Sequence, residues 1–256
     1  MNRTGLIVAL SLSLAFVLLM AVFPDLDLWF ARYFYHPETR NFPIGGGPVV
    51  RILRETAMII AWAFCLPAIV AFIVKLARPD RPLLISGRTV AFFLITMTLT
   101  AGIVTNLAFK THWGRPRPVD VAEFNGKHQF MPWWQPGGAC PRNCSFFSGE
   151  AATAFWTYAP AALAPPQWRP LAYAGATIFG LATGALRMTF GGHFFSDVIV
   201  AGFATFLIIW LMHGLIYRWP ATRTSDARVD ALLTRWAWPF YAWRRGLFGK
   251  KPEAKR

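Results

Sequence analysis

Three short polar segments interrupt an otherwise apolar chain, and they hold the side chains that could do chemistry. They are KTHWGRPRP at residues 110–118, SFFSGE at residues 145–150 and RMTFGGHFFSD at residues 187–197. Each segment adjoins a long apolar stretch. Ionisable residues beside a membrane core are energetically costly, so their presence indicates function by default.

The cations in these segments are suited to binding a phosphate group. Lys110, Arg117 and Arg187 supply one compact ammonium charge and two forked guanidinium groups, which match phosphate oxygens. Ser148 and Gly149 precede an apolar stretch that predicts a helix. Free N–H groups at a helix start bind anions, and glycine lets an anion approach the backbone closely.

His193 and Asp197 predict a nucleophile for that phosphate. They are four residues apart, so they share one face if the intervening turn is helical. A carboxylate on one imidazole nitrogen sets the tautomer and leaves the other nitrogen free to attack. Positioning and charge stabilisation supply most of the catalysis in phosphoryl transfer. The combination therefore predicts an enzyme of that class.

The order and spacing of these residues resemble the type 2 phosphatidic acid phosphatase superfamily of membrane lipid phosphatases. The family pattern is K-x6-RP, then PSGH, then SR-x5-H-x3-D, and this chain has Lys110-x6-Arg117 and Arg187-x5-His193-x3-Asp197. The resemblance implies that His193 forms a phosphohistidine and that Asp197 orients it. It implies a group of phosphate-binding residues, which are Lys110, Arg117, Ser148, Gly149 and Arg187. It also implies a helical bundle that needs no metal and no other cofactor.

The middle motif departs from the family pattern. Phe147 stands where the family has proline, and Glu150 stands where it has the histidine that protonates the leaving group. Glu150 acts as that acid only if burial raises its pKa, which the surrounding cations oppose. Alternatively, Glu150 pairs with an arginine while His128 or His112 supplies the proton, or the leaving group needs little help. Leu186 in place of the family serine is a lesser change.

Six apolar stretches must position these segments. Hydrophobic residues make up 55% of the 256 residues and charged residues 15%, which is less charge than a soluble domain carries. Each stretch is near the ~20 residues that a helix needs to cross a bilayer, and they cover residues 5–23, 57–74, 89–109, 151–168, 170–186 and 198–217. We therefore predict an all-α integral membrane bundle of six transmembrane helices. Gly180 and Gly184 permit close packing of the fifth helix.

The distribution of positive charge predicts the topology. Ten of the 26 Lys and Arg residues follow Tyr217, which predicts a cytoplasmic tail and, with six helices, a cytoplasmic N-terminus. The polar segments then face the periplasm of a bacterial inner membrane. We divide the chain into a phosphatase domain at residues 1–217, with its core motifs at 110–197, and a basic tail at residues 218–256. The tail is rich in Trp and predicted to be interfacial or partly disordered.

The long external stretch before residue 150 holds two cysteines and a further arginine. Cys140 and Cys144 are candidates for a disulfide in an oxidising compartment, although their close spacing restricts the geometry. A C-x3-C spacing without other ligands does not suit zinc. Arg115 is expected to be either a cation at the rim of the site or a structural ion-pair partner. The external stretch at residues 24–56 is expected to form short helical pieces along the membrane interface.

By this resemblance and topology, the predicted function is hydrolysis of a phosphomonoester or diphosphate of an anionic lipid. Lipid A 1-phosphate ranks first by a small margin, ahead of undecaprenyl diphosphate and phosphatidylglycerol phosphate. The alternatives are a lipid phosphotransferase on the same scaffold and a non-enzymatic lipid or anion transporter. The net charge of +14 does not by itself indicate nucleic acid. The expected partners are the lipid phosphate and the surrounding membrane lipids, and the oligomeric state is left open.

Overall fold

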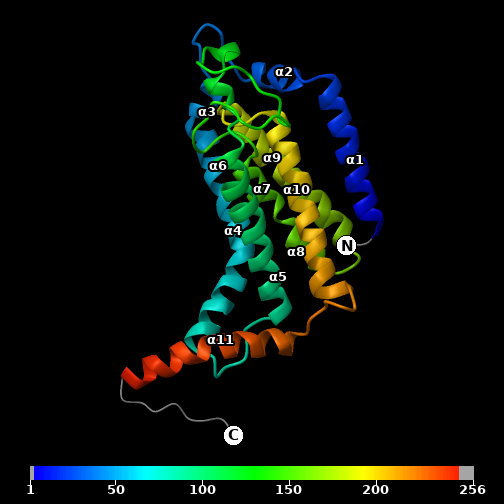
Figure 1. Cartoon of the computed structure of the whole chain (residues 1–256), viewed down its shortest axis with the longest axis vertical. Helices are drawn as coiled ribbons and strands as arrows, with labels where there is room; N and C mark the ends of the chain where they lie inside the picture. Colours follow the sequence, from blue (N-terminus) through cyan, green and yellow to red (C-terminus); the bar gives the residue numbers. More distant parts are fainter. Residues whose placement is uncertain (1–2, 248–256) are drawn as a thin grey trace. The chain divides into compact units, whose positions relative to one another are not determined.

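The computed structural model describes residues 3–247, which form helices and loops with no strand among them. Four helical spans are long and apolar enough to cross a membrane: Arg3–Val22 (α1), Pro48–Ala77 (α4), Gly87–His112 and Phe195–Arg218. The third span comprises α5 (Gly87–Met97), η1 (Thr98–Phe109) and α6 (Lys110–His112), and the fourth comprises α10 (Phe195–His213) and η4 (Gly214–Arg218). These spans confirm a helical membrane protein and match the first, second, third and sixth predicted stretches (Figure 1).

The fourth predicted stretch differs from the expectation of one continuous helix. It forms α7 (Gly149–Phe155) and α8 (Tyr158–Leu163), with a turn at Trp156 and Thr157 between them. Pro160 explains the break, because its ring lacks an N–H and clashes with the carbonyl group four residues earlier. The Trp156 side chain is buried at this turn, and its indole N–H donates to the Thr96 hydroxyl at 2.9 Å. In the described part of the chain, four helical spans and not six have the length and composition to cross a membrane.

The helix α9 (Arg169–Thr189) covers the fifth predicted stretch and packs closely on its neighbours. A Cβ atom on Gly180 would lie 2.2 Å from the Phe155 ring of α7. A Cβ atom on Gly184 would lie 2.1 Å from the Val198 side chain of α10. The two glycines therefore let three helices approach, as their spacing predicts. This packing brings together the start of α7, the end of α9 and the start of α10 (Figure 1).

Short helical pieces cover this end of the helices. They are α2 (Leu26–Arg32), α3 (Pro43–Gly46), η2 (Pro118–Asp120) and η3 (Ala122–Phe124). An apolar cluster holds the loops together and comprises Leu28, Ala31, Phe42, Val121, Phe124 and Phe194. Because Phe194 directly precedes α10, the cluster fixes α2 and the loop at residues 113–148 next to the turn that bears His193.

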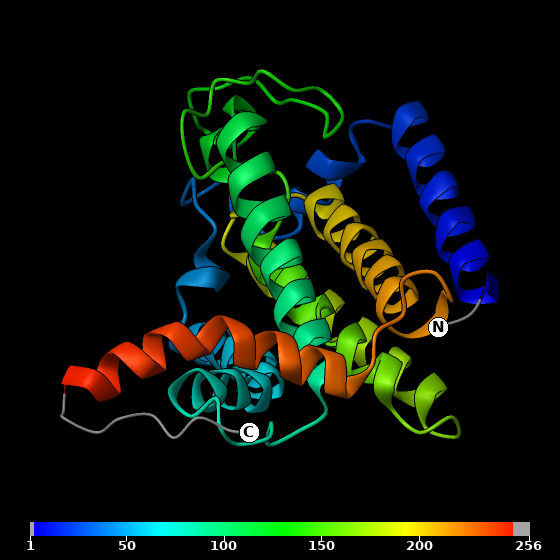
Figure 2. The ribbon, with the colours of Figure 1, turned by 60° about the horizontal axis from the view of Figure 1, so that its bottom comes forward.

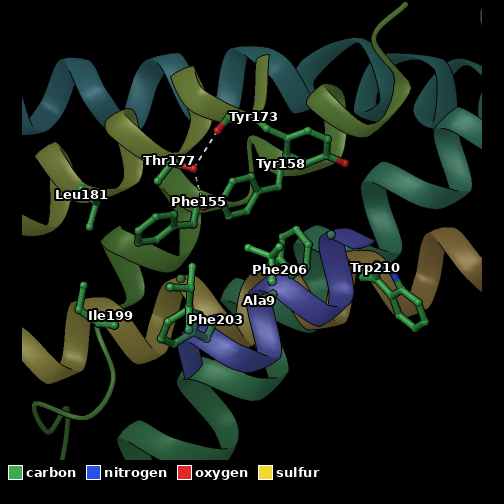
Figure 3. Close-up of a pocket in the computed structure, with 14 residues that line it drawn as sticks. Ala9, Phe155, Tyr158, Tyr173, Thr177, Leu181, Ile199, Phe203, Phe206 and Trp210 are labelled. Atoms are coloured by element: carbon green, nitrogen blue, oxygen red, sulfur yellow. Dashed lines mark hydrogen bonds between the residues drawn. The ribbon is translucent and has the colours of Figure 1, made fainter. Parts of the chain in front are cut away.

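An apolar cavity of about 470 Å³ lies between α1, α7, α8, α9 and α10 (Figure 3). Its walls include Ala9, Phe155 and Phe203. The Tyr158 hydroxyl also borders it and is hydrogen-bonded to the Thr177 hydroxyl at 2.9 Å. None of the predicted site residues lines this cavity. The chemistry must therefore be sought where the three polar segments meet.

The chain divides into two compact units, of which the second holds residues 63–95 and the chain from Met212 onward. Within it, α11 (Asp226–Leu247) is tied to the end of α4 and the start of α5 by ion pairs. Lys75 Nζ lies 3.0 Å from Asp230, and the Arg88 guanidinium lies 3.3 Å from Asp226. Figure 2 shows α11, in orange and red, crossing the end of α4.

The helix α11 carries two apolar stripes. One stripe is buried and comprises Val229, Leu233, Ala237 and Tyr241. The other is exposed and comprises Leu232, Trp236, Phe240 and Trp243. This helix forms most of the described part of the predicted tail at residues 218–256, and Lys250 and Lys251 lie outside the described residues.

Candidate active site

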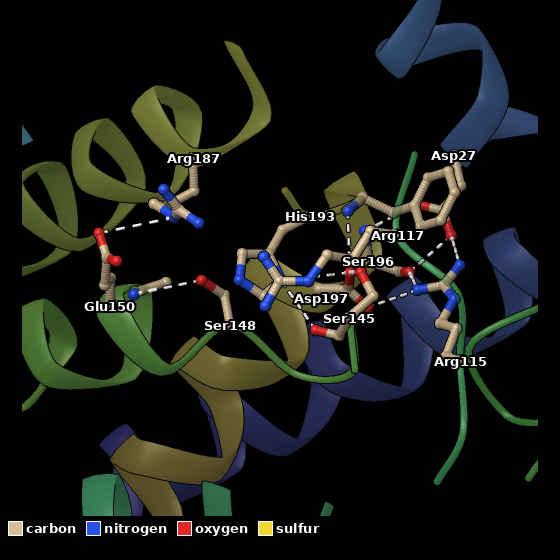
Figure 4. Close-up of polar contacts among 12 residues, drawn as sticks. Asp27, Arg115, Arg117, Ser145, Ser148, Glu150, Arg187, His193, Ser196 and Asp197 are labelled. Atoms are coloured by element: carbon tan, nitrogen blue, oxygen red, sulfur yellow. Dashed lines mark hydrogen bonds and ion pairs between the residues drawn. The ribbon is translucent and has the colours of Figure 1, made fainter. Parts of the chain in front are cut away.

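His193 lies in the tight turn between α9 and α10. Gly191 in this turn has φ of 58°, a left-handed conformation that glycine adopts without strain. The imidazole Nδ1 lies 2.7 Å from the carbonyl oxygen of Ser145, and Asp197 Oδ2 lies 3.6 Å away at ion-pair distance (Figure 4). A carbonyl oxygen can only accept a hydrogen bond, so Nδ1 carries the proton. The other nitrogen, Nε2, then presents a free lone pair.

Burial has the largest effect on the protonation of His193, which is 2% exposed. Desolvation disfavours the imidazolium form and lowers the pKa of His193, while the hydrogen bond and charge of Asp197 raise it. The charges of Arg187 and Lys110 lower it further. The net effect holds the pKa below the ordinary value for histidine, which leaves the imidazole neutral at neutral pH. A neutral imidazole with a free Nε2 is a nucleophile.

Asp197 ties the turn that bears His193 to the middle polar segment. It is fully buried in the first turn of α10 and accepts hydrogen bonds from the Phe194 N–H at 2.8 Å and the Ser145 hydroxyl at 2.5 Å. A carboxylate in the first turn can cap the helix, and the positive end of the helix dipole stabilises its charge. Ser145 therefore contacts both members of the predicted nucleophilic pair.

Arg115 is fully buried between two carboxylates. Its guanidinium donates to Asp197 at 2.5 Å and to Asp27 of α2 at 2.7 Å. It also donates to the Ser196 hydroxyl at 2.9 Å and lies over the Phe194 ring at 4.4 Å. Of the two expectations for Arg115, the structural ion pair is confirmed and the rim cation is wrong. Burial raises the pKa of Asp27, against the charge of Arg115, which lowers it.

Ser148 and Gly149 begin α7 beside this network. The Ser148 hydroxyl accepts from the Ala151 N–H at 3.3 Å, and the Ser148 N–H donates to the Asp197 carbonyl oxygen at 3.2 Å. A Cβ atom on Gly149 would lie 3.3 Å from Lys110 Nζ. The missing side chain of Gly149 thus leaves room for the lysine ammonium group next to the start of α7.

The Arg117 side chain is held by a loop closed with a disulfide. Its Nε and Nη2 donate to the carbonyl oxygen of Asn143 at 3.1 and 2.8 Å. Cys140 and Cys144 form the disulfide, and their Cα atoms are 5.7 Å apart. Because Asn143 lies inside this five-residue loop, the disulfide restrains the carbonyl group that orients Arg117.

Glu150 lies between two arginines. Arg54 of α4 donates two hydrogen bonds to its carboxylate, at 2.8 and 2.6 Å. Arg187 Nε lies 3.5 Å from one carboxylate oxygen (Figure 4). Burial raises the pKa of Glu150, but the Arg54 hydrogen bonds and the charges of Arg187 and Arg54 outweigh it. The pKa is held below its ordinary value, so Glu150 is ionised. This arrangement supports pairing with arginine, not the role of proton donor.

The two histidines considered as other proton donors lie in their own local contacts. The His112 Nδ1 lies 2.9 Å from the carbonyl oxygen of Leu107 in the same helical span, and its side chain is exposed. The backbone of His128 pairs with that of Asp120 in the loop at residues 113–148. Neither contact connects these imidazoles to His193.

The structure thus brings the three polar segments to one place. The charge of Lys110 interacts with those of Arg117, Arg187, Glu150 and Asp197. The sequence analysis missed four residues of the site, which are Asp27, Arg54, Ser145 and Ser196. The first two are charged residues close to apolar stretches, a signal that could have identified them. Within residues 3–247, no group of three His, Cys, Asp or Glu side chains could hold a metal ion.

Comparison with known proteins agrees with this chemistry. The model of the PAP2 superfamily matches residues 89–224. A lipid A 4'-phosphatase of Francisella tularensis subsp. novicida (strain U112) is 33% identical over 198 residues, which cover 77% of this chain and 89% of the relative. A lipid A 4'-phosphatase of Rhizobium leguminosarum is 28% identical over 206 residues, which cover 76% of this chain and 88% of the relative. No solved structure matches the chain. With its apolar helical spans, the chain belongs to the PAP2 superfamily and is a membrane lipid phosphatase, a phosphoric monoester hydrolase.

Proposed function

We propose that the protein hydrolyses a phosphate ester of lipid A and that His193 is the nucleophile. The observation that carries the proposal is the hydrogen bond from His193 Nδ1 to the Ser145 carbonyl oxygen. This bond leaves Nε2 free beside an unusual concentration of cations, which are Lys110, Arg117 and Arg187. Such a combination orients a nucleophile and stabilises the charge of the transferring phosphoryl group.

The reaction proceeds in two steps. Nε2 of His193 forms a bond to phosphorus while the bond between phosphorus and the lipid oxygen breaks, and the lipid oxygen takes up a proton. Water then attacks the phosphohistidine, which releases inorganic phosphate and regenerates neutral His193. Lys110, Arg117 and Arg187 bind the phosphoryl oxygens in both steps, with Ser148 and Gly149 beside them. Asp197 stabilises the positive charge that develops on the imidazole.

The proton for the leaving group does not come from Glu150 in this proposal. Its carboxylate accepts two hydrogen bonds from Arg54 and is ionised. We assign the proton to water that reaches the site with the substrate. A lipid diphosphate, whose leaving group is a weakly basic lipid phosphate, then reacts faster than a phosphate ester, whose leaving group is an alkoxide.

The position of the hydrolysed phosphate is assigned from the relatives. Both relatives that cover most of this chain are named for the 4'-phosphate of lipid A. They favour the 4'-phosphate over the 1-phosphate that the sequence analysis ranks first. The same relatives favour lipid A over undecaprenyl diphosphate and phosphatidylglycerol phosphate.

The test is a substrate panel with the purified protein in detergent. Lipid A bearing both phosphates, undecaprenyl diphosphate and phosphatidylglycerol phosphate are incubated separately, and inorganic phosphate is measured. Mass spectrometry of the lipid A product then locates the remaining phosphate. We expect phosphate release with loss of the 4'-phosphate. Loss of the 1-phosphate would overturn the positional assignment.

The same panel addresses the two alternative functions. A phosphotransferase would release little phosphate and would label a second lipid added as acceptor. A transporter would leave every lipid intact. The variant His193→Ala is the control for contaminating phosphatases, since it should release no phosphate.

The proposal places the site on the periplasmic side of the inner membrane, with both termini in the cytoplasm. The positive charge that follows Tyr217 supports this orientation. Single cysteines at Lys127 and Asp80 test it in intact cells with a membrane-impermeant thiol reagent. We expect labelling at residue 127 and none at residue 80. The reverse labelling pattern would show that the protein has the opposite orientation in the membrane.

A further inference from the structure

Arg54 is a charged residue far from the three polar segments in sequence, yet it contacts the site directly. It lies in the second turn of α4, 96 residues before Glu150. Its Nε and Nη2 donate to the two different oxygens of the Glu150 carboxylate, at 2.8 and 2.6 Å. This forked geometry is the strongest form of ion pair that an arginine makes, and it fixes the carboxylate in both position and rotation.

The fixed carboxylate also faces Arg187. Arg187 Nε lies 3.5 Å from the Glu150 oxygen that accepts from Arg54 Nε, and this buried nitrogen has no hydrogen-bond partner within residues 3–247. Both guanidinium groups lie over the ring of Phe190, at 5.7 Å for Arg54 and 5.2 Å for Arg187. Two arginines thus share one aromatic ring and one carboxylate.

The exposure of these side chains decreases from Arg54 to Arg187. The Arg54 side chain is 38% exposed, Glu150 is 22% exposed and Arg187 is 10% exposed. The two guanidinium charges repel each other, and an anion between them offsets this repulsion. Glu150 is that anion, and it holds Arg187 with unused donor capacity next to His193.

We propose that Arg54 is a positioning residue, which locks Glu150 as a carboxylate so that Glu150 holds Arg187 in the phosphate site. Position 150 is then an anchor for a phosphate-binding arginine and takes no part in proton transfer. This inference rests on the proposed function, because it assigns Arg187 to the phosphate.

A pH profile separates this role from a merely structural one. The charged and titratable groups that face Glu150 are Arg54 from α4, Arg187 from α9, His193 from the turn before α10 and Lys110 from the start of α6. Glu55 of α4 also faces Arg54. The pKa of Glu150 is held low, so its anchoring role is present at neutral pH and is lost as the pH falls through that lowered pKa. Arg54 lowers the pKa of Glu150, so removing Arg54 raises that pKa. Glu150 should then lose its anchoring role at a higher pH than in the wild type.

The experiment compares kcat/KM against pH for the full-length wild type, Arg54→Gln, Arg54→Lys, Glu150→Gln and the double variant Arg54→Gln/Glu150→Gln. We expect Arg54→Gln to lower kcat/KM about tenfold or more at neutral pH, as is typical when a residue that orients a ligand-binding side chain is lost. Its acid limb should move to higher pH. Arg54→Lys keeps the charge without the fork and should recover part of the activity.

The other variants make the test decisive. The double variant should be no worse than Glu150→Gln alone, because both remove the same anchor. Glu150→Gln should slow phosphate esters and lipid diphosphates by the same factor, whereas loss of a general acid would slow esters more. The control is Arg51→Gln, one turn earlier on α4 and exposed, which should behave as wild type.

Two outcomes would overturn the inference. One is wild-type kcat/KM with an unmoved acid limb in Arg54→Gln, and the other is additive losses in the double variant. Size-exclusion profiles and thermal unfolding in detergent establish that each variant is folded. His193→Ala is measured in parallel, so retained activity in that variant would reject the proposed function independently of Arg54.

Discussion

The imidazole of His193 and the carbonyl oxygen of Ser145 are joined by a 2.7 Å hydrogen bond between residues 48 apart in the sequence. Ser145 also donates its hydroxyl to Asp197, which lies at ion-pair distance from the same imidazole nitrogen. One residue therefore sets the tautomer of the proposed nucleophile through its backbone and orients the neighbouring carboxylate through its side chain. Ser145 can be replaced without removing the carbonyl group, so the two contributions can be measured separately.

The neutral state of His193 predicts the pH dependence of activity. The nucleophile must be unprotonated, and burial holds the pKa of His193 below its ordinary value, so kcat/KM should fall only when the pH drops below about 6.5. Asp197 raises that pKa, so Asp197→Asn should move the acid limb to still lower pH while reducing kcat. Ser145→Ala keeps the carbonyl group and should retain more activity than Asp197→Asn. An acid limb that moves to higher pH in Asp197→Asn would contradict the assignment.

The buried ion pairs of Arg115 predict a large effect on stability. Arg115→Met would leave the carboxylates of Asp27 and Asp197 buried without their cation, which costs about 3–5 kcal/mol. Thermal unfolding in detergent should show a marked loss, and Asp27→Asn in the same background should recover part of it. Arg117→Met is the matched control, since Arg117 is partly exposed and donates to a backbone carbonyl oxygen, with no buried carboxylate to leave unpaired. An unfolding temperature equal to wild type in Arg115→Met would refute the pairing.

The disulfide predicts a specific kinetic defect. Replacing Cys140 and Cys144 with serine should loosen the loop that holds the Arg117 side chain. Because Arg117 is then less well positioned, KM should rise several-fold, with a smaller change in kcat. The state of the two sulfurs is measured by alkylation without reductant followed by mass spectrometry. We expect only Cys65 to be alkylated after denaturation. Alkylation of both loop cysteines in protein from its native membrane would rule out the bond.

The exposed apolar stripe of α11 predicts immersion in the membrane interface. A nitroxide label at residue 236 or 240 should be more accessible to oxygen than to a water-soluble nickel complex. A label at Ala231, which lies on the other side of the helix and is exposed, should show the opposite preference. Anionic lipids should strengthen the difference, because arginines such as Arg235 and Arg244 accompany the stripe. Equal accessibility at residues 231 and 236 would place α11 in water.

Much of the fold follows from the sequence because membrane helices have a simple signature. Long apolar stretches identified α1, α4 and the spans that end at His112 and begin at Phe195, since length and composition alone decide them. The break between α7 and α8 was missed because Pro160 lies in an otherwise apolar stretch, where only the tertiary structure shows whether a helix bends or ends. The glycines of α9 predicted a close approach, but they did not identify Phe155 and Val198 as the contacts.

The site was predictable where side chains act through their own charge. Lys110, Arg117, Arg187, Glu150, His193 and Asp197 all lie in the three polar segments, and the structure brings these segments together. The contribution of Ser145 was not predictable, because a backbone carbonyl has no sequence signature. The pairing of Arg54 with Glu150 was not predictable either, because it joins two helices through residues that are 96 apart in the sequence. The contacts in the tertiary structure therefore support an arginine-pairing role for Glu150, which the sequence left open.

The most direct test of the account is to trap the phosphoryl group on the protein. The purified enzyme is mixed with lipid A that carries radioactive phosphate, quenched in alkali within milliseconds and digested for mass spectrometry. We expect an alkali-stable, acid-labile phosphate on the peptide that contains His193, and no label in His193→Ala, which should also release no inorganic phosphate. Label on another residue, or phosphate release by folded His193→Ala above a few per cent of wild type, would contradict it.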